Sequence, residues 1–272
     1  MALPGDDSLP SLVGLIGLKL PLEDPPSDES RCLSTLHSFG GTSVTIRSIP
    51  KRDYYGTDVE LTGFSSWFAS TLFSQFACQE QRAVTLFGGG RSILELGSGA
   101  GMAGCALAKC LQRLGEPMGV IVLTDGEKQV VDLLRSNIAD NGLSAGVLCQ
   151  ELLWCPSPTL DELMRCNPQG FTVIFGCDLL YNAAQGAKVL GGLFHVVDAL
   201  LSRTPASAFY LAFTRRDLDL ATVFEAGHQC GFLADLQEDY VYDIFGSNTD
   251  GMTAFWRDAV YRFYRPESGE RG

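Results

Sequence analysis

The stretch RSILELGSGAG, residues 91–101, organises the rest of this chain. Its first half contains the apolar run ILEL, which is typical of a strand buried on both faces of a parallel sheet. Its second half, residues 97–101, holds only glycine, serine and alanine. It therefore predicts a tight turn whose backbone N–H groups face a ligand at the start of a helix. The following run MAGCALAKCLQRL, residues 102–114, predicts that helix.

Glu95 bears on which cofactor the turn holds. Gly99, Gly101 and Gly104 have the G-x-G-x-x-G spacing of dinucleotide sites, so a nicotinamide-dependent oxidoreductase is one alternative. An acid two residues before the first glycine would repel a pyrophosphate. The same carboxylate suits a ligand with an ammonium group, such as S-adenosylmethionine. The stretch ELGSGAG resembles the first motif of the seven-strand S-adenosylmethionine-dependent methyltransferases.

Composition limits the class of protein and the kind of partner. Hydrophobic residues make up 46% of the 272 residues and charged residues 19%, which indicates a globular chain. The length suits one α/β domain with an extension. With 20 Lys+Arg against 32 Asp+Glu, the net charge is −12. This charge argues against unaided binding to nucleic acid or to an anionic membrane, and it favours a basic partner.

Cysteine, histidine and the N-terminal residues indicate the compartment. The nine cysteines include no C-x-x-C pair, and the three histidines lack metal-ligand spacing, so we expect reduced thiols and no metal site. Asp6 and Asp7 stand where a signal peptide would be basic, and no apolar run approaches 18 residues. We expect a cytoplasmic protein that is neither exported nor membrane-spanning.

The remaining segments predict an α/β fold with a Rossmann-like, mainly parallel seven-strand sheet and helices on both faces. Gly40 and Gly41 separate two β-forming runs within residues 32–50, which predicts a β-hairpin. Further strands are expected at residues 119–124, 146–154, 171–178 and 208–214, with an antiparallel pair at 236–245 and 254–264. Further helices are expected within residues 56–76, 126–142, 190–201 and 219–232.

Acidic and aromatic side chains stand at the ends of several expected strands. Asp125 can accept both ribose hydroxyls of either a dinucleotide or an adenosyl group, with Glu127 as a nearby substitute, and either acid could instead cap the next helix. Trp154, which the third strand is expected to reach, can line an adenine pocket or pack in the core. Asp178 ends the fourth strand and is followed by Leu-Leu-Tyr181. In open α/β sheets, function lies at these strand ends.

Three kinds of motif follow one another along the chain: G-F-x-x-W at residues 63–67, the ELGSGAG turn, and strand ends that read T-D, L-x-W and D-L-L-Y. The set is similar to methyltransferase family 16, the seven-β-strand protein-lysine methyltransferases. Within it, TGFSSWFASTL, ILELGSGAGMAGCALAK and YLAFTRR look most like the enzymes that modify translation elongation factor 2. The resemblance implies an N-terminal extension over residues 1–54 and a methyltransferase domain over residues 55–272.

The resemblance also implies S-adenosylmethionine as the cofactor, with S-adenosylhomocysteine as the product. Trp67 would lie over the cofactor, residues 97–99 would surround its amino-acid end, and Asp125 would hold the ribose. Trp154 would contact the adenine, and the backbone at Cys177, where the family usually has alanine, would lie on the sulfonium side. The full set of predicted cofactor-binding residues is Trp67, Glu95, Gly97, Ser98, Gly99, Gly101, Asp125, Trp154 and Cys177.

The resemblance maps a D-x-x-Y motif onto Asp178 and Tyr181, which would face the incoming lysine as the catalytic residues. Neither side chain is a strong base at pH 7, so we expect both to position the amine and water to take its proton. D-P-P-Y loops that stack a flipped base contain two prolines, and Leu179 and Leu180 replace them here. We therefore expect a basic or lysine-presenting protein as the substrate. A non-catalytic cofactor-binding partner protein remains a further alternative.

Overall fold

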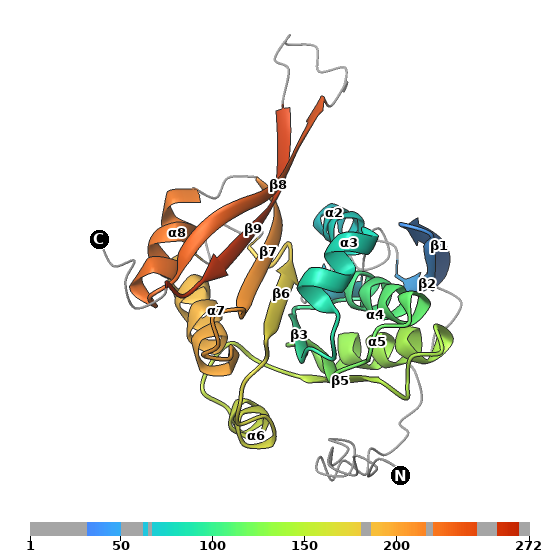
Figure 1. Ribbon diagram of the computed structural model, residues 1–272, viewed down its shortest axis with the longest axis horizontal. Helices are drawn as coiled ribbons and strands as arrows, with labels where there is room; N and C mark the ends of the chain where they lie inside the picture. Colours follow the sequence, from blue (N-terminus) through green and yellow to red (C-terminus); the bar gives the residue numbers. More distant parts are fainter. Residues whose placement is uncertain are drawn as a thin grey trace, which may run out of the picture.

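Seven strands of the computed structural model form one sheet in the order β5-β4-β3-β6-β7-β9-β8 (Figure 1). The structure describes residues 32–49, 62–64, 67–180, 186–215, 220–243 and 255–266. The strands are β3 Ile93–Leu96, β4 Ile121–Asp125, β5 Val147–Glu151, β6 Val173–Cys177, β7 Ala208–Arg215, β8 Leu233–Asp243 and β9 Phe255–Tyr264. The neighbouring strands β5, β4, β3, β6 and β7 are parallel to one another, and β9 pairs antiparallel with both β7 and β8. The predicted mainly parallel, Rossmann-like sheet is confirmed.

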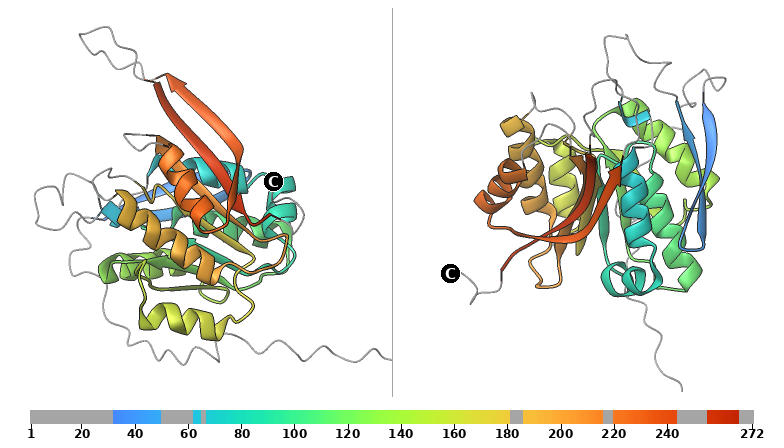
Figure 2. Two further views of the ribbon diagram at one scale, coloured as in Figure 1. Left: turned by 90° about the vertical axis from the view of Figure 1, so that its left-hand side faces the viewer. Right: turned by 90° about the horizontal axis from the view of Figure 1, so that it is seen from above.

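Helices cover both faces of the sheet, as predicted (Figure 2). Helices α2, α4 and α5 contribute to the apolar core on one face, and α6, α7 and α8 contribute to the core on the other. The main helices are α2 Phe68–Ala77, α4 Met102–Leu114, α5 Lys128–Asp140, α6 Pro158–Cys166, α7 Gly186–Leu200 and α8 Leu220–Gln229. Shorter turns are η3 Thr62–Phe64, α3 Glu80–Arg82 and η4 Ala83–Phe87. None of the helices in these ranges is long and apolar enough to cross a membrane.

Strand β3 lies inside the sheet, between β4 and β6, and is buried along its whole length. Ile93 packs into the core beneath α4, whereas Leu94 and Leu96 pack into the opposite core. This alternation explains the continuous apolar run, because each face of the strand meets a helix layer. Helix α4 begins and ends at the predicted residues, and Gly115 terminates it with a left-handed φ of 71°.

The predicted N-terminal hairpin is present as β1 Leu33–Phe39 and β2 Thr42–Ser48. Gly40 and Gly41 form its two-residue turn with φ angles of 51° and 78°, which glycine adopts without strain. Val44 and Ile46 on β2 are fully buried, and β2 packs against α4 and α5. The hairpin thus shares a core with the sheet. The predicted domain boundary after residue 54 lies outside the described residues.

The structure differs from the prediction at two places, the end of the third strand and an additional helix. The third strand was expected to reach Trp154, but β5 ends at Glu151 and Trp154 lies in a bend beyond it. Helix α6 was not predicted, although Ser157 caps it by accepting a hydrogen bond from Leu160 N at 3.3 Å and Pro158 occupies its first turn. The predicted antiparallel pair is confirmed as β8 and β9, whose outer ends extend beyond the helix layers (Figures 1 and 2).

Candidate cofactor and substrate site

The turn after β3 has the backbone of a ligand cradle. Gly97, Gly99 and Gly101 all have positive φ angles, of 59°, 54° and 83°. A side chain would strain each of these positions, and a methyl group at Gly101 would also collide with the side chain of Leu134. Gly101 occupies the N-cap position of α4, so the free N–H groups of the first helical turn begin here. The glycines predicted from the sequence are therefore required by the backbone.

Hydrogen bonds attach this turn to the end of β4. The backbone N–H of Ser98 donates to Thr124 O at 2.7 Å, and Ser98 Oγ accepts from Thr124 N at 3.0 Å. The Gly99 N–H donates to Asp125 Oδ2 at 3.0 Å. Thr124 Oγ1 donates to Glu95 O at 2.7 Å, which closes the connection back to β3. Two neighbouring strand ends thus hold the turn in one conformation.

Asp125 lies where the sequence predicts the ribose-binding acid. Its Oδ1 accepts a hydrogen bond from Glu127 N at 3.2 Å, so both carboxylate oxygens receive backbone N–H groups. Burial nevertheless raises the pKa of Asp125 above its usual value. Gly63 in η3 packs over the same point, because a methyl group built on Gly63 would lie 3.5 Å from Asp125 Oδ2. Glu127, the alternative ribose ligand, is exposed.

Glu95 is buried in the wall of the turn, with 1% of its surface exposed. Its Oε2 atom lies against the backbone of Gly104 in α4, where a methyl group would approach it to 2.5 Å. Burial raises the pKa of Glu95 to about 8, which the nearby polar groups of Ser98 and Gly104 offset only in part. Within the described part of the chain, Oε2 is a buried acceptor without a hydrogen bond. A buried carboxyl group in this state favours a cationic partner or a bound proton.

Trp154 lies beside the glycine turn although β5 ends three residues earlier. A methyl group built on Gly97 would lie 3.6 Å from Trp154 Cζ2 and 2.6 Å from Leu179 Cδ2. Leu179 is buried between Gly97 and Gly176, where a methyl group would also collide with it. The indole and this leucine therefore both lie beside Gly97 at the end of β3. They come from the segments that follow β5 and β6.

Asp178 follows β6 in an unusual backbone conformation. It has a φ of 56° and is the one non-glycine residue with positive φ in the described ranges. Its N–H donates to Ala212 O at 2.7 Å, and the residue is 6% exposed. Cys177 before it is buried, and burial raises the pKa of its thiol, with smaller contributions from the carboxyl groups of Glu95 and Asp178. The ends of β3 and β6 therefore bring three predicted site residues close together.

Of two further predicted site residues, the structure describes Trp67 but not Tyr181. Trp67 is half-buried at the N-cap position of α2, where its carbonyl accepts a hydrogen bond from Ser70 N at 3.0 Å. Its position over a cofactor stays a prediction. Tyr181, the predicted partner of Asp178 in the D-x-x-Y motif, lies outside the described residues. Within the described ranges, no group of three or more His, Cys, Asp or Glu side chains is arranged to hold a metal ion.

Sequence reasoning did not identify several residues that shape the turn. Thr124 was predicted only as the end of a strand, yet its hydroxyl and backbone join β3, β4 and the turn. Asn137 on α5 donates a hydrogen bond to Ala100 O at 2.8 Å. Its spacing of four residues from Asn141 was the available signal, because such a pair lies on one face of a helix.

Curated proteins similar to this chain carry related names. It is 29% identical over 196 residues to human protein-lysine N-methyltransferase EEF2KMT, covering 68% of this chain and 54% of that protein. It is 30% identical over 211 residues to the mouse protein of the same name, covering 72% and 56%. Similarity to protein-lysine N-methyltransferase EFM3 of Chaetomium thermophilum is 25% over 233 residues, covering 83% and 64%. The chain spans a little over half the length of these mammalian relatives.

Comparison with solved structures bears on the fold, and comparison with family models bears on the family. A protein from Streptococcus mutans that has been assigned as a SAM-dependent methyltransferase superposes with a TM-score of 0.52 at 12% identity, covering 89% of this chain and 57% of that one. This likeness shows the shared fold. Residues 59–230, which include every strand end of the site, match the family described as lysine methyltransferase. The chain therefore belongs to the lysine methyltransferase family.

Proposed function

We propose that this protein transfers a methyl group from S-adenosylmethionine to the side-chain amine of a lysine in another protein. The observation that carries the proposal is the family match over residues 59–230, because it contains the glycine turn, Asp125, Trp154 and Asp178. The geometry around the turn supports the same conclusion. The family match lends no support to the nicotinamide-dependent alternative.

The described residues fit the parts of S-adenosylmethionine. We assign residues 97–99 to the amino-acid end of the ligand, where the buried carboxyl group of Glu95 in the wall of the turn suits the ammonium group. We assign Asp125 to the ribose and the Trp154 ring, which lies beside Gly97, to the adenine. Gly101, the N-cap residue of α4, would lie at the amino-acid end of the ligand. The backbone at Cys177 would lie on the sulfonium side. Trp67 would cover the ligand from α2.

When bound, S-adenosylmethionine supplies a methyl group on a cationic sulfonium, which a neutral lysine amine can displace to leave S-adenosylhomocysteine. Lysine is mostly protonated at pH 7, so presenting the neutral amine costs about 4–5 kcal/mol. We assign Asp178 to orienting this amine, because it directly follows β6 at the carboxyl ends of the parallel strands, where the glycine turn also lies. Tyr181 would provide a second contact, and water would accept the proton.

The relatives' names suggest the substrate class. The mammalian relatives are named EEF2KMT, so we propose a translation elongation factor as the substrate. The net charge of −12 supports a basic or lysine-presenting protein over nucleic acid. We place the reaction in the cytoplasm.

The test is transfer of tritiated methyl groups into a cell extract that lacks this protein, with the products separated on a gel. Wild-type protein should label one protein band near the size of elongation factor 2, and Asp178→Asn should not. Asparagine is the matched control because it tolerates positive φ almost as well as aspartate.

Each other outcome rejects part of the proposal. A protein band of another size keeps the enzyme class and rejects the elongation-factor substrate. Label found only in RNA rejects the protein-lysine reaction. Absence of label, in a sample where calorimetry shows binding of S-adenosylhomocysteine, supports the non-catalytic binding protein instead.

A further inference from the structure

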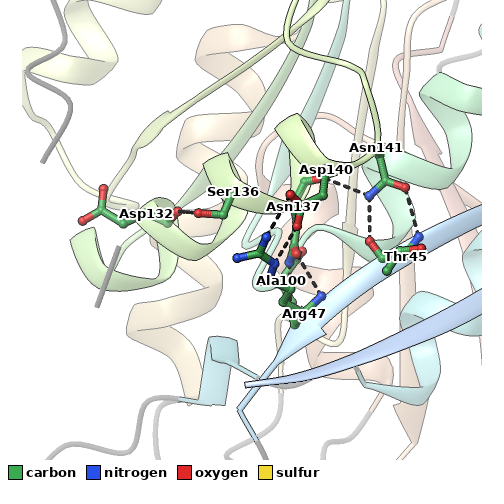
Figure 3. A network of polar contacts seen from close by, with 8 residues as sticks. All are labelled: Thr45, Arg47, Ala100, Asp132, Ser136, Asn137, Asp140 and Asn141. Atoms are coloured by element: carbon green, nitrogen blue, oxygen red, sulfur yellow. Dashed lines mark hydrogen bonds and ion pairs between the residues drawn. The ribbon is translucent and has the colours of Figure 1, made fainter. Parts of the chain in front are cut away.

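The buried side chain of Asn137 connects the N-terminal hairpin to the glycine turn. Asn137 lies on α5 and is 0% exposed. Its Oδ1 accepts a hydrogen bond from Arg47 N at 2.8 Å, and its Nδ2 donates to Arg47 O at 2.9 Å and to Ala100 O at 2.8 Å (Figure 3). Both N–H groups of the amide are therefore used, one on the hairpin and one on the turn.

The carbonyl group that accepts the hydrogen bond from Asn137 belongs to Ala100, within the turn. Ala100 lies between Gly99, whose N–H is held by Asp125, and Gly101, whose N–H donates to Ser98 O at 2.8 Å. Asp125 thus fixes the turn from β4, and Asn137 fixes it from α5. These two attachments set the direction of the peptide groups that would face the cofactor.

Asn141, the C-cap residue of α5 and four residues beyond Asn137, supplies a natural comparison. Its Oδ1 accepts from Thr45 N at 3.0 Å, and its Nδ2 donates to Thr45 O at 2.7 Å and Asn137 O at 2.8 Å (Figure 3). Both asparagines pair with the backbone of β2 as a neighbouring strand would. Of the two, Asn137 is the one that also reaches the turn.

We propose that Asn137 is a positioning residue that couples the β1–β2 hairpin to the cofactor turn, so that a docked hairpin keeps the turn competent to bind cofactor. The inference deepens the proposed function and rests on it for the identity of the ligand, S-adenosylmethionine. It assigns the hairpin a role in cofactor affinity, in addition to any role in substrate choice. The ion pair between Arg47 and Asp140, at 2.6 Å, strengthens the hairpin side of this connection.

The test compares Asn137→Ala with Asn141→Ala. Each variant removes two hydrogen bonds to the backbone of β2, so both should lower the melting temperature by a similar amount. At a temperature where circular dichroism shows both to be folded, Asn137→Ala should weaken binding of S-adenosylhomocysteine about tenfold, and Asn141→Ala less than twofold. In turnover assays, Asn137→Ala should raise KM for S-adenosylmethionine and leave kcat at saturating cofactor unchanged.

Hydrogen exchange provides a second readout that needs no ligand. In wild-type protein and Asn141→Ala, the amides of residues 97–101 should exchange slowly, and in Asn137→Ala they should exchange at least tenfold faster. If Asn137→Ala does not fold, Asn137→Leu has nearly the same side-chain shape, carries no charge and removes both donors and the acceptor, and Asn141→Leu is its control. Equal effects of the two asparagine sites on affinity and exchange would overturn the proposal. Failure of wild-type protein to bind S-adenosylhomocysteine would reject the proposed function, while exchange would still test the coupling.

Discussion

The two turns that close the candidate site solve the same backbone problem differently. The turn after β3 has positive φ at three positions and fills each with glycine, and its hydrogen bonds with Thr124, Asp125 and Asn137 hold it. In the turn after β6, as far as residue 180, Asp178 is the residue with positive φ. Glycine would relieve the strain there, and Asp178 supplies a carboxyl group that glycine would lack. The comparison leads us to propose that the first turn binds through its backbone and the second acts through a carboxylate.

The largest effect should come from the carboxylate turn. Asp178→Asn retains the left-handed conformation and removes the charge, so we expect kcat to fall by about 100- to 1,000-fold, because the amine is no longer oriented. Binding of S-adenosylhomocysteine should change less than twofold. Initial rates and calorimetry on the same sample measure both quantities. A variant that loses binding and turnover together would mean that Asp178 belongs to the binding half of the site.

Glu95 tests the electrostatics of the first turn through protein stability. Because its pKa is raised to about 8, the folded protein retains this proton between pH 4.5 and 8 while the unfolded chain releases it. Wild-type stability is therefore penalised progressively as pH rises through this window, and Glu95→Gln should escape the penalty. Between pH 4.5 and 7 the difference should shift in favour of the variant by roughly 3 kcal/mol. Urea unfolding at both pH values measures the shift. A difference that does not vary with pH would show that Glu95 has an ordinary pKa.

A methyl group in the first turn should weaken cofactor binding. Gly99→Ala strains a residue with φ of 54° and places its methyl 3.0 Å from Gly63 O, so the turn must move. We expect affinity for S-adenosylhomocysteine to fall at least tenfold. Gly115→Ala is the matched control, because its φ is 71° and its methyl would meet open space at the end of α4. The control should lose about 1 kcal/mol of stability and keep its affinity. Equal losses of affinity at the two sites would contradict a backbone-binding role for the turn.

The smallest effect should come from relieving strain at the second turn. Asp178→Gly removes the penalty on a positive φ, so the melting temperature should rise by a few degrees, corresponding to about 1 kcal/mol, while turnover is lost. Calorimetric scans of the two proteins at one pH measure this difference. A lower melting temperature in the variant would show that contacts of the Asp178 side chain stabilise the fold more than its backbone strains it.

The sequence predicted the elements whose signals are local. The apolar run of β3, the glycines after it and the uninterrupted helical run of α4 all lie within residues 91–114, and the structure places β3 and α4 there. Gly40 and Gly41 located the hairpin for the same reason, since a two-residue turn needs positive φ at both positions. The end of β5 was mispredicted because Leu152, Leu153 and Trp154 continue an apolar run. Leu153 is in fact exposed beyond the strand.

The contacts that complete the site depend on distant parts of the chain. The side chain of Asn137 bonds to residues 37 and 90 positions away, Ala100 and Arg47. The four-residue spacing from Asn141 places the two asparagines on one face of the helix, but it does not show whether that face is buried or exposed. The positive φ of Asp178 likewise could not be predicted from the sequence, because a strand followed by an aspartate predicts no particular φ. Both features arise from packing between elements, which periodicity does not report.

The most direct test of the central claim is chemical identification of the methylated residue. Purified protein, tritiated S-adenosylmethionine and extract lacking the protein are incubated, the labelled band is hydrolysed, and its amino acids are separated. The account predicts that the label is recovered as methylated lysine with wild-type protein and is absent with Asp178→Asn. Recovery of the label in another amino acid or in a nucleotide would contradict the assignment of the carboxylate turn to a lysine amine.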